Sequence, residues 1–171
     1  RAVQTLPGQP CRWLTLADFD HNGGIDILTG GDSTQVYWNR LNGPFVADES
    51  FPRAAITAGV PADLDDDGDL DVWLGGPGLR AVDNNGGNAR DWIELRLRAQ
   101  QEKGGSLSNS KRVNHQGIGS LVELRSGGRY QAAIVEGQSV RFGLGTLRTP
   151  GQPSPPPEVI RILWTNGVPR A

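Results

Sequence analysis

The most constraining feature of the sequence is an aspartate-rich segment that occurs twice in the first half. Residues 17–31 align with residues 62–76 without a gap, and equivalent residues are 45 positions apart, as Asp18 and Asp63 show. Each copy contains a short loop of aspartate and glycine, then a brief apolar run, then a Gly-Gly pair. A fixed internal period of this length predicts two copies of one supersecondary unit.

Oxygen-bearing side chains recur at alternate positions of each loop. With the first aspartate as position 1, they stand at positions 1, 3, 5 and 9, and the glycine at position 6 permits a sharp bend. The position-7 carbonyl can add one more oxygen, and Ca²⁺ takes six to eight oxygen ligands. We therefore predict two structural calcium sites, formed by Asp18, Asp20, Asn22, Gly24 and Asp26 and by Asp63, Asp65, Asp67, Asp69 and Asp71.

Other ions and motifs fit these loops less well. An EF-hand requires a bidentate Glu at position 12, where this chain has Thr29 and Leu74. Mg²⁺ prefers few protein ligands and retained waters, and Zn²⁺ prefers His or Cys. We expect His21 to face away from the ion and the side chains of Asp66 and Asp69 to point outward. The competing interpretation is a pair of solvated Asp/Gly turns without an ion.

The composition predicts an all-β protein. The chain has 24 Gly and 12 Pro in 171 residues, and alternating apolar runs of five to eight residues outnumber helix-period runs. Each repeat reads as loop, strand, turn, strand, turn and strand, with residues 35–39 as one strand of the first copy. This is the size and order of a β-propeller blade.

The pattern changes after Asp83. Residues 92–98 alternate with Ile93, Leu95 and Leu97 on one face, and residues 121–125 and 130–135 flank a Gly-Gly turn as a hairpin. Residues 140–145 and 159–164 are further strands, whereas 100–116 and 150–157 are polar and proline-rich loops. We predict two propeller-blade-like repeat units in residues 1–83 and a small antiparallel β-sandwich in residues 84–171.

Charge and cysteine content exclude several classes. The net charge is −2 and there is no basic stripe, so nucleic acid is not an expected partner. No apolar stretch reaches the roughly 18 residues of a membrane span. The chain has no Met, and residues 166–171 resemble a hairpin cut after its turn, so we expect it to be part of a longer product. Cys11 is predicted to be a buried small apolar residue; a covalent link outside the chain is the alternative.

The two loops resemble the calcium-binding repeats of FG-GAP/VCBS type. The resemblance covers about residues 14–79 and rests on the D-x-D-x-[DN]-G-x-x-D spacing and on residues 37–45. It implies a propeller-type, extracytoplasmic interaction module. Complete propellers of this family need about seven repeats, so two copies imply that other units or a partner cover the open sheets.

The second half is similar to the ASPIC/UnbV domain, which often follows such repeats, as in cartilage acidic protein-like secreted proteins. The matching segments are residues 88–97, 114–124, 142–145 and 160–167. This resemblance implies architecture and a periplasmic or secreted location. Two insertions, residues 103–112 and the proline-rich segment, are candidate contact loops.

No catalytic constellation is recognisable. The sequence lacks a Cys/His pair, a G-x-S-x-G elbow and a Walker loop; His115 reads as a turn residue, and Glu123 and Glu136 as solvated strand residues. We therefore predict a non-enzymatic calcium-binding interaction or scaffold module, docked as a subunit on a larger protein assembly, either with or without a membrane association. The alternatives are a glycan-binding module with a row of exposed Trp, and a hydrolase supported by the loops.

Overall fold

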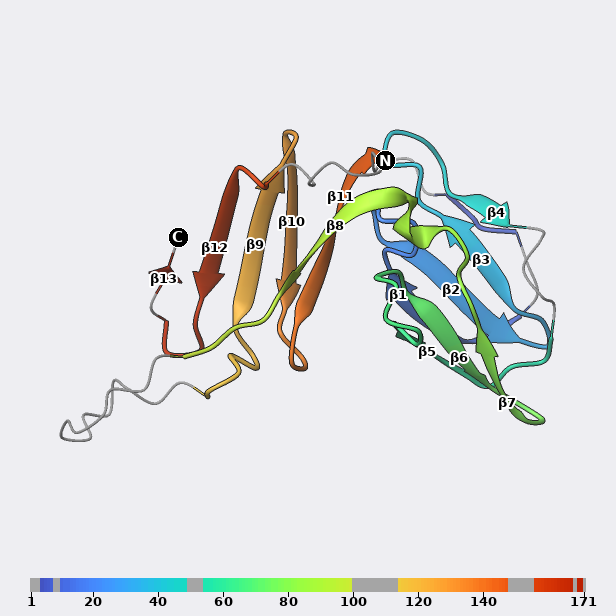
Figure 1. Ribbon diagram of the computed structural model, residues 1–171. Coiled ribbons are helices and arrows are strands. Elements are labelled where there is room, and N and C mark those ends of the chain that lie inside the picture. Colours follow the sequence, from blue (N-terminus) through green and yellow to red (C-terminus); the bar gives the residue numbers. More distant parts are fainter. Residues whose placement is uncertain are drawn as a thin grey trace.

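The computed structural model describes residues 4–7, 10–48, 54–99, 114–147, 156–167 and 169–170 (Figure 1). In these ranges the chain is built of antiparallel strands and one short 3₁₀ turn, η1 (Gly87–Ala89). The predicted all-β class is confirmed. The candidate contact loop at 103–112 and most of the proline-rich segment lie outside the described residues. No helix in the described part is long and apolar enough to cross a membrane.

The first repeat forms a four-stranded sheet in the order β1-β2-β3-β4. Its strands are β1 (Cys11–Ala17), β2 (Asp26–Gly31), β3 (Gln35–Trp38) and β4 (Val46–Asp48). The unit therefore begins with a strand before the acidic loop, which the sequence pattern did not predict. Because Ala17 pairs with Asp26, the two ends of the loop are held side by side by the β1–β2 ladder.

The second repeat forms a three-stranded sheet with the same register. It contains β5 (Ala58–Ala62), β6 (Asp71–Gly75) and β7 (Leu79–Val82). Ala62 pairs with Asp71, as Ala17 pairs with Asp26 in the first copy. The 45-residue offset thus relates the strand pairing of the two sheets as well as their loops.

The two repeat sheets pack face to face and share one hydrophobic cluster. The first sheet contributes Leu28 and Val36, which are 0% and 3% exposed, and the second contributes Val72 and Leu74 at 4% and 2%. Leu28 and Val36 are repeat counterparts of Trp73 and Ala81, not of Val72 and Leu74. The sheets therefore stack head to tail, with unlike faces in contact, which is the heterologous kind of packing.

The second half has its own hydrophobic cluster. A four-stranded sheet in the order β10-β9-β12-β13 and a two-stranded ribbon of β8 and β11 enclose it. Ile93 and Leu95 pack against this cluster and Leu97 is buried in it, which confirms the predicted apolar face. The remaining strands are β8 (Arg90–Leu95), β9 (Leu121–Ser126), β10 (Arg129–Ile134), β11 (Val140–Leu147), β12 (Val159–Leu163) and β13 (Pro169–Arg170).

The predicted interior position of Cys11 is wrong. Cys11 is exposed on β1, and its thiol donates a hydrogen bond to the carbonyl of Trp13 at 2.9 Å. The pair Cys11 and Gly31 lies at a register shift of the β1–β2 ladder, where the regular alternation of the strand is interrupted. The predicted boundary between residues 83 and 84 stays a prediction.

Candidate metal centres

Two acidic triads lie at equivalent places in the repeat sheets. Each consists of the position-1, position-3 and position-9 carboxylates, and within a triad one oxygen of each residue lies within 4.8 Å of the others. Position 9 is the first residue of the strand after the loop, so the strand ladder brings it back beside position 1. The triads are Asp18, Asp20 and Asp26 in the first copy and Asp63, Asp65 and Asp71 in the second.

The position-9 carboxylate is fixed by the same two backbone hydrogen bonds in both copies. Asp26 accepts from the amides of Phe19 at 2.9 Å and Asn39 at 2.7 Å. Asp71 accepts from the amides of Leu64 and Asn84, each at 2.8 Å. Because amide donors stabilise a carboxylate, these bonds hold the innermost aspartate of each loop in one orientation.

Asn39 and Asn84 are functional residues that the sequence reasoning missed. Each donates its side-chain amide to the carbonyl that precedes position 9, in Ile25 or Leu70. Asn84 also donates to the carbonyl of Phe19 in the first loop, at 2.8 Å, and so connects the two loops. The signal was available, because Asn39 and Asn84 are 45 residues apart like the aligned loops.

The bend of each loop uses left-handed backbone at positions 4 and 6. The φ angles are 52° at His21 and 86° at Gly23, and 61° at Asp66 and 104° at Gly68. Glycine adopts this conformation without the Cβ clash that other residues meet. The position-3 carboxylate then accepts the amide two residues later, at 3.1 Å in both copies. The two loops therefore share one backbone shape.

Buried carboxylate oxygens without partners show that the triads fit a cation. One oxygen of Asp18 and the equivalent oxygen of Asp63 are buried and make no hydrogen bond. Burial and the nearby carboxylates of Asp26 and Asp20 raise the pKa of Asp18 to about 7. Burial raises the pKa of Asp26 to about 6. Since a buried unpaired charge is costly, a hard divalent cation among these oxygens removes the penalty.

The predicted ligands at position 5 accept hydrogen bonds from the position-7 amides, and the position-7 carbonyls stay predicted ligands. The side-chain oxygen of Asn22 accepts from the amide of Gly24 at 2.7 Å, and Asp67 accepts from the amide of Asp69 at 3.1 Å. Asn88 donates its side-chain amide to Asp67 at 2.6 Å. Their coordination of an ion stays a prediction.

The expected outward orientation of the Asp69 side chain is wrong. Asp69 is 1% exposed, and one of its carboxylate oxygens accepts the amide of Asn88 at 3.2 Å. The physical reason is the turn before β8, which folds over the second loop and shields this side chain from water. Burial raises the pKa of Asp69 to about 6. Asp66 is exposed, as expected.

His21 lies outside the triad, as predicted. It is 1% exposed, and its ring lies 6.0 Å from the ring of Trp92. Neither ring nitrogen has a hydrogen-bond partner, and burial together with Arg141 lowers the pKa of His21 to about 4. The ring is therefore a neutral packing element between the first loop and β8.

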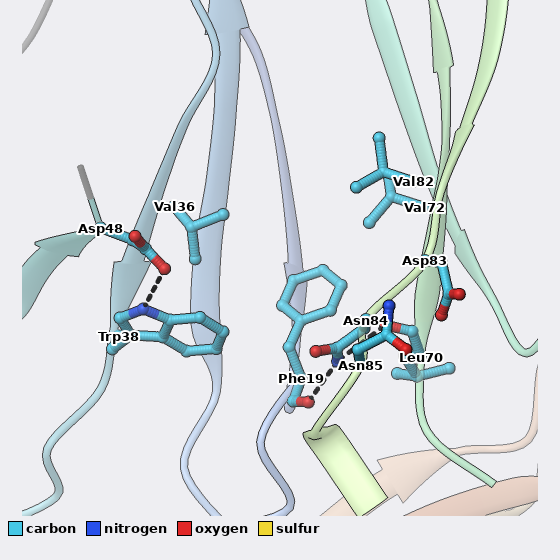
Figure 2. A pocket seen from close by; sticks show the side chains of 10 residues that line it. All are labelled: Phe19, Val36, Trp38, Asp48, Leu70, Val72, Val82, Asp83, Asn84 and Asn85. Atoms are coloured by element: carbon cyan, nitrogen blue, oxygen red, sulfur yellow. Dashed lines mark hydrogen bonds between the residues drawn. The ribbon is translucent and has the colours of Figure 1, made fainter. Parts of the chain in front are cut away.

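A cavity of about 320 Å³ lies between the two repeat sheets (Figure 2). Trp38 and Val36 form one wall, Val72 and Val82 lie opposite, and Phe19 lies between them. The lining residues provide apolar surface, two carboxylates and two amides, with no histidine, cysteine or serine among them.

The glutamates considered as an acid–base pair are separate in the structure. Glu123 forms an ion pair with Arg161 at 3.1 Å and accepts a hydrogen bond from the hydroxyl of Tyr130. Glu136 is exposed in the turn after β10, and His115 is exposed in the turn before β9. Glu123 therefore connects β9 to both neighbouring strands, through Arg161 on β12 and Tyr130 on β10.

Comparison with known proteins supports the first half of this description. The model of the FG-GAP-like repeat family matches residues 18–74, about one third of the chain. The match begins at the first aspartate of the first triad and extends past Asp71, the last residue of the second. No curated protein and no solved structure matches the chain. The resemblance of the second half to the ASPIC/UnbV domain stays a prediction.

Proposed function

We propose that the chain is a non-enzymatic, extracytoplasmic interaction module in which two calcium ions stiffen the repeat sheets. In this proposal Asp18, Asp20 and Asp26 hold one ion and their counterparts hold the other. In each repeat the calcium serves to fix the turn between two strands. The FG-GAP-like match over residues 18–74 supports both the interaction role and a location outside the cytoplasm.

The observation that carries the interaction role is the free face of the second repeat sheet. Val60, Trp73 and Leu79 are 59%, 39% and 71% exposed on β5, β6 and β7, and Ala58 and Ala81 lie exposed beside them. Cross-strand pairing places Val60, Trp73 and Ala81 in one row. A row of apolar side chains across three strands is typical of a protein contact surface.

The repeat offset indicates what covers this face. Trp73 and Leu79 are the counterparts of Leu28 and Thr34, which are 0% and 1% exposed. Leu28 lies against the second sheet in the cluster that joins the two repeats. The exposed face of the second sheet thus corresponds to the face of the first sheet that the second sheet covers. We propose that a further sheet of the same kind, from a longer form of the protein or from a partner subunit, docks here.

A glycan-binding role has less support. A flat row of exposed tryptophans would favour it, but Trp73 is the exposed one of the five, and Trp13, Trp38, Trp92 and Trp164 are partly buried. Trp13 donates its indole N–H to the carbonyl of Ile56 at 2.7 Å, and Trp38 donates to Asp48 at 3.0 Å. These tryptophans pack and orient strands.

Site-specific photo-crosslinking tests the proposed docking face. A photoreactive residue replaces Leu79, on the free face, or Tyr130, which is 66% exposed on β10, in the cells that produce the protein. We expect a defined crosslinked product from position 79 that Trp73→Glu abolishes, and none from position 130. Equal products from both positions, or none from position 79, would contradict the proposal.

A further inference from the structure

The ribbon of β8 and β11 lies across both acidic loops. In Figure 1 these strands run between the β9–β10–β12 sheet and the repeat sheets. Strand alternation gives the ribbon two faces. Phe142 and Leu144 point into the hydrophobic cluster of the second half. The alternate residues Arg141, Gly143 and Gly145 contact the loops.

The first loop is held through its backbone carbonyls. Gly145 donates its amide to the carbonyl of His21 at 2.9 Å. Arg90, from β8, donates to the carbonyl of Asp20 at 2.8 Å and lies 3.1 Å from the Asp20 carboxylate. Arg129, from β10, donates to the carbonyl of Asn22. Three consecutive carbonyls of the first loop, those of residues 20, 21 and 22, therefore accept hydrogen bonds from the second half.

From the ribbon, Arg141 provides the hydrogen bonds to the second loop. Arg141 donates to the carbonyl of Gly68 at 3.1 Å and to the Asp63 carboxylate at 3.0 Å. The Arg141 and Asp63 side chains are 19% and 14% exposed, so the pair is largely shielded from water. Arg141 also stacks on Trp92 at 4.8 Å, and any Cβ at Gly68 would overlap the Trp92 ring.

These contacts depend on the conformation that gathers the carboxylates. In each loop the triad carboxylates converge, and the carbonyls of residues 20, 21, 22 and 68 are the acceptors that the second half uses. A cation that closes the loop also presents these acceptors. By linkage, docking of the ribbon must favour cation binding by the same factor.

We propose that the β8–β11 ribbon completes the two calcium sites, with Arg90 and Arg141 as positioning residues, so that calcium affinity and docking of the second half are coupled. The inference rests on the proposed calcium role of the loops. It adds that residues 18–74, the part with the family match, are not sufficient for full affinity. It also states that calcium binding stabilises the contact between the two halves of the chain.

A glycine substitution can disturb the contact between the ribbon and the first loop without changing any charge. A Cβ at Gly143 would overlap the Asp18 carboxylate and the backbone of His21, whereas one at Gly137 meets nothing within 4 Å. Neither site has positive φ, so alanine suits both backbones. Calorimetric titration of the full chain with Ca²⁺ should give Gly143→Ala an affinity at least about five-fold weaker at one site, the lower end of typical allosteric couplings. Gly137→Ala should match the wild type.

For substitution of Arg141, the proposal predicts a change in calcium affinity opposite in sign to the one that charge alone predicts. Removing a positive charge beside a cation site should tighten Ca²⁺ binding if Arg141 acts only through its charge. If Arg141 positions the loop, Arg141→Gln and Arg141→Lys both weaken binding, because Arg141 reaches Gly68 and Asp63 with two different nitrogens and lysine has only one. Arg161→Gln, which breaks an ion pair within the second half, is the matched control and should leave the affinity unchanged. Arg141→Gln requires no backbone change, so it covers the case in which Gly143→Ala does not fold.

The reverse coupling is measured by hydrogen exchange of the wild type. Chelation should accelerate exchange of the Gly145 amide, which bonds to His21, and leave the Val122 amide of β9 unchanged. A wild type that binds no Ca²⁺ overturns both this inference and the calcium role. A wild type that binds Ca²⁺ while Gly143→Ala and Arg141→Gln bind it equally well overturns the coupling alone.

Discussion

Replacing Asp18 by Asn should stabilise the calcium-free protein and destabilise the calcium-loaded one. Asp18 has a buried carboxylate oxygen without a partner and a pKa raised to about 7 by burial and by neighbouring carboxylates. At neutral pH without metal, its ionised form is therefore disfavoured in the folded state. Asn removes the charge and keeps an oxygen that can accept the Gly23 amide, which Asp18 accepts at 2.9 Å.

The size and sign of the effect follow from proton linkage. A carboxyl with a folded pKa of about 7 and an unfolded value of 3.8 stabilises the fold below pH 3.8, and this contribution is lost as pH rises through 7. A shift of roughly 3 pKa units at about 1.4 kcal/mol each gives an upper bound of about 4 kcal/mol. In chelator at pH 8, the free energy of unfolding of Asp18→Asn should therefore exceed that of the wild type by up to this amount. Near pH 4 the two free energies should be equal.

Calcium should reverse the order of the two proteins. At 1,000 times its dissociation constant, an ion that binds only the folded state adds about 4.1 kcal/mol, which offsets the upper bound of about 4 kcal/mol, and the variant loses a ligand for that ion. Urea unfolding at pH 8, 6 and 4, with calcium and with chelator, measures all of these differences. Asp32→Asn is the matched control, because Asp32 forms an exposed ion pair with Arg12 far from the triads. A variant that is less stable than the wild type in chelator at pH 8 would refute the reasoning.

Three further perturbations have defined outcomes. Saturating calcium should raise the melting temperature in calorimetry by roughly 10 °C or more if both triads fill. Asp20→Asn and Asp65→Asn should each remove about half of this shift. Equal melting temperatures with calcium and with chelator would exclude the sites. Leu28→Ala should cost about 2–5 kcal/mol in urea unfolding because Leu28 is 0% exposed. Leu79→Ala, at 71% exposure, should change stability by about 0.5 kcal/mol or less. Asn84→Ala leaves the carbonyl of Phe19 without its donor, and should cost about 1–3 kcal/mol in the same assay.

Local spacing was enough to predict the acidic triads. Residues at positions 1, 3 and 9 are close in sequence, and the loop geometry that joins them is set by glycine and by the strand that follows. The prediction that the Asp69 side chain is exposed was wrong, because its burial depends on Asn88, which lies 19 residues away and outside the repeat. The pattern also gave no sign of β1 or β5 as the first strand of each unit, since Pro61 and several exposed apolar side chains blur their alternation.

Long-range contacts were beyond the reach of the sequence. Strand alternation predicts only that Arg90 and Arg141 point away from the core of the second half. Arg129 shares a strand face with Ala133, which packs against that core. Arginines on a strand face are usually solvated, so nothing local distinguishes these three from Arg161, which pairs within its own sheet. Their targets lie 70 to 107 residues away. Each of the three arginines donates to at least one backbone carbonyl, and a backbone carbonyl carries no sequence signal.

The second half also makes two loops of equivalent spacing unequal. In the first loop the outer oxygen of Asp18 accepts the loop's own Gly23 amide, whereas the equivalent oxygen of Asp63 accepts from Arg141. Each triad has a guanidinium beside one ligand, but at a different position: Arg90 lies beside Asp20, at position 3, and Arg141 lies beside Asp63, at position 1. The second loop also carries additional aspartates at 66, 67 and 69, which add negative potential near its triad. The two sites are therefore related by sequence but tuned by different residues, and their calcium affinities need not be equal.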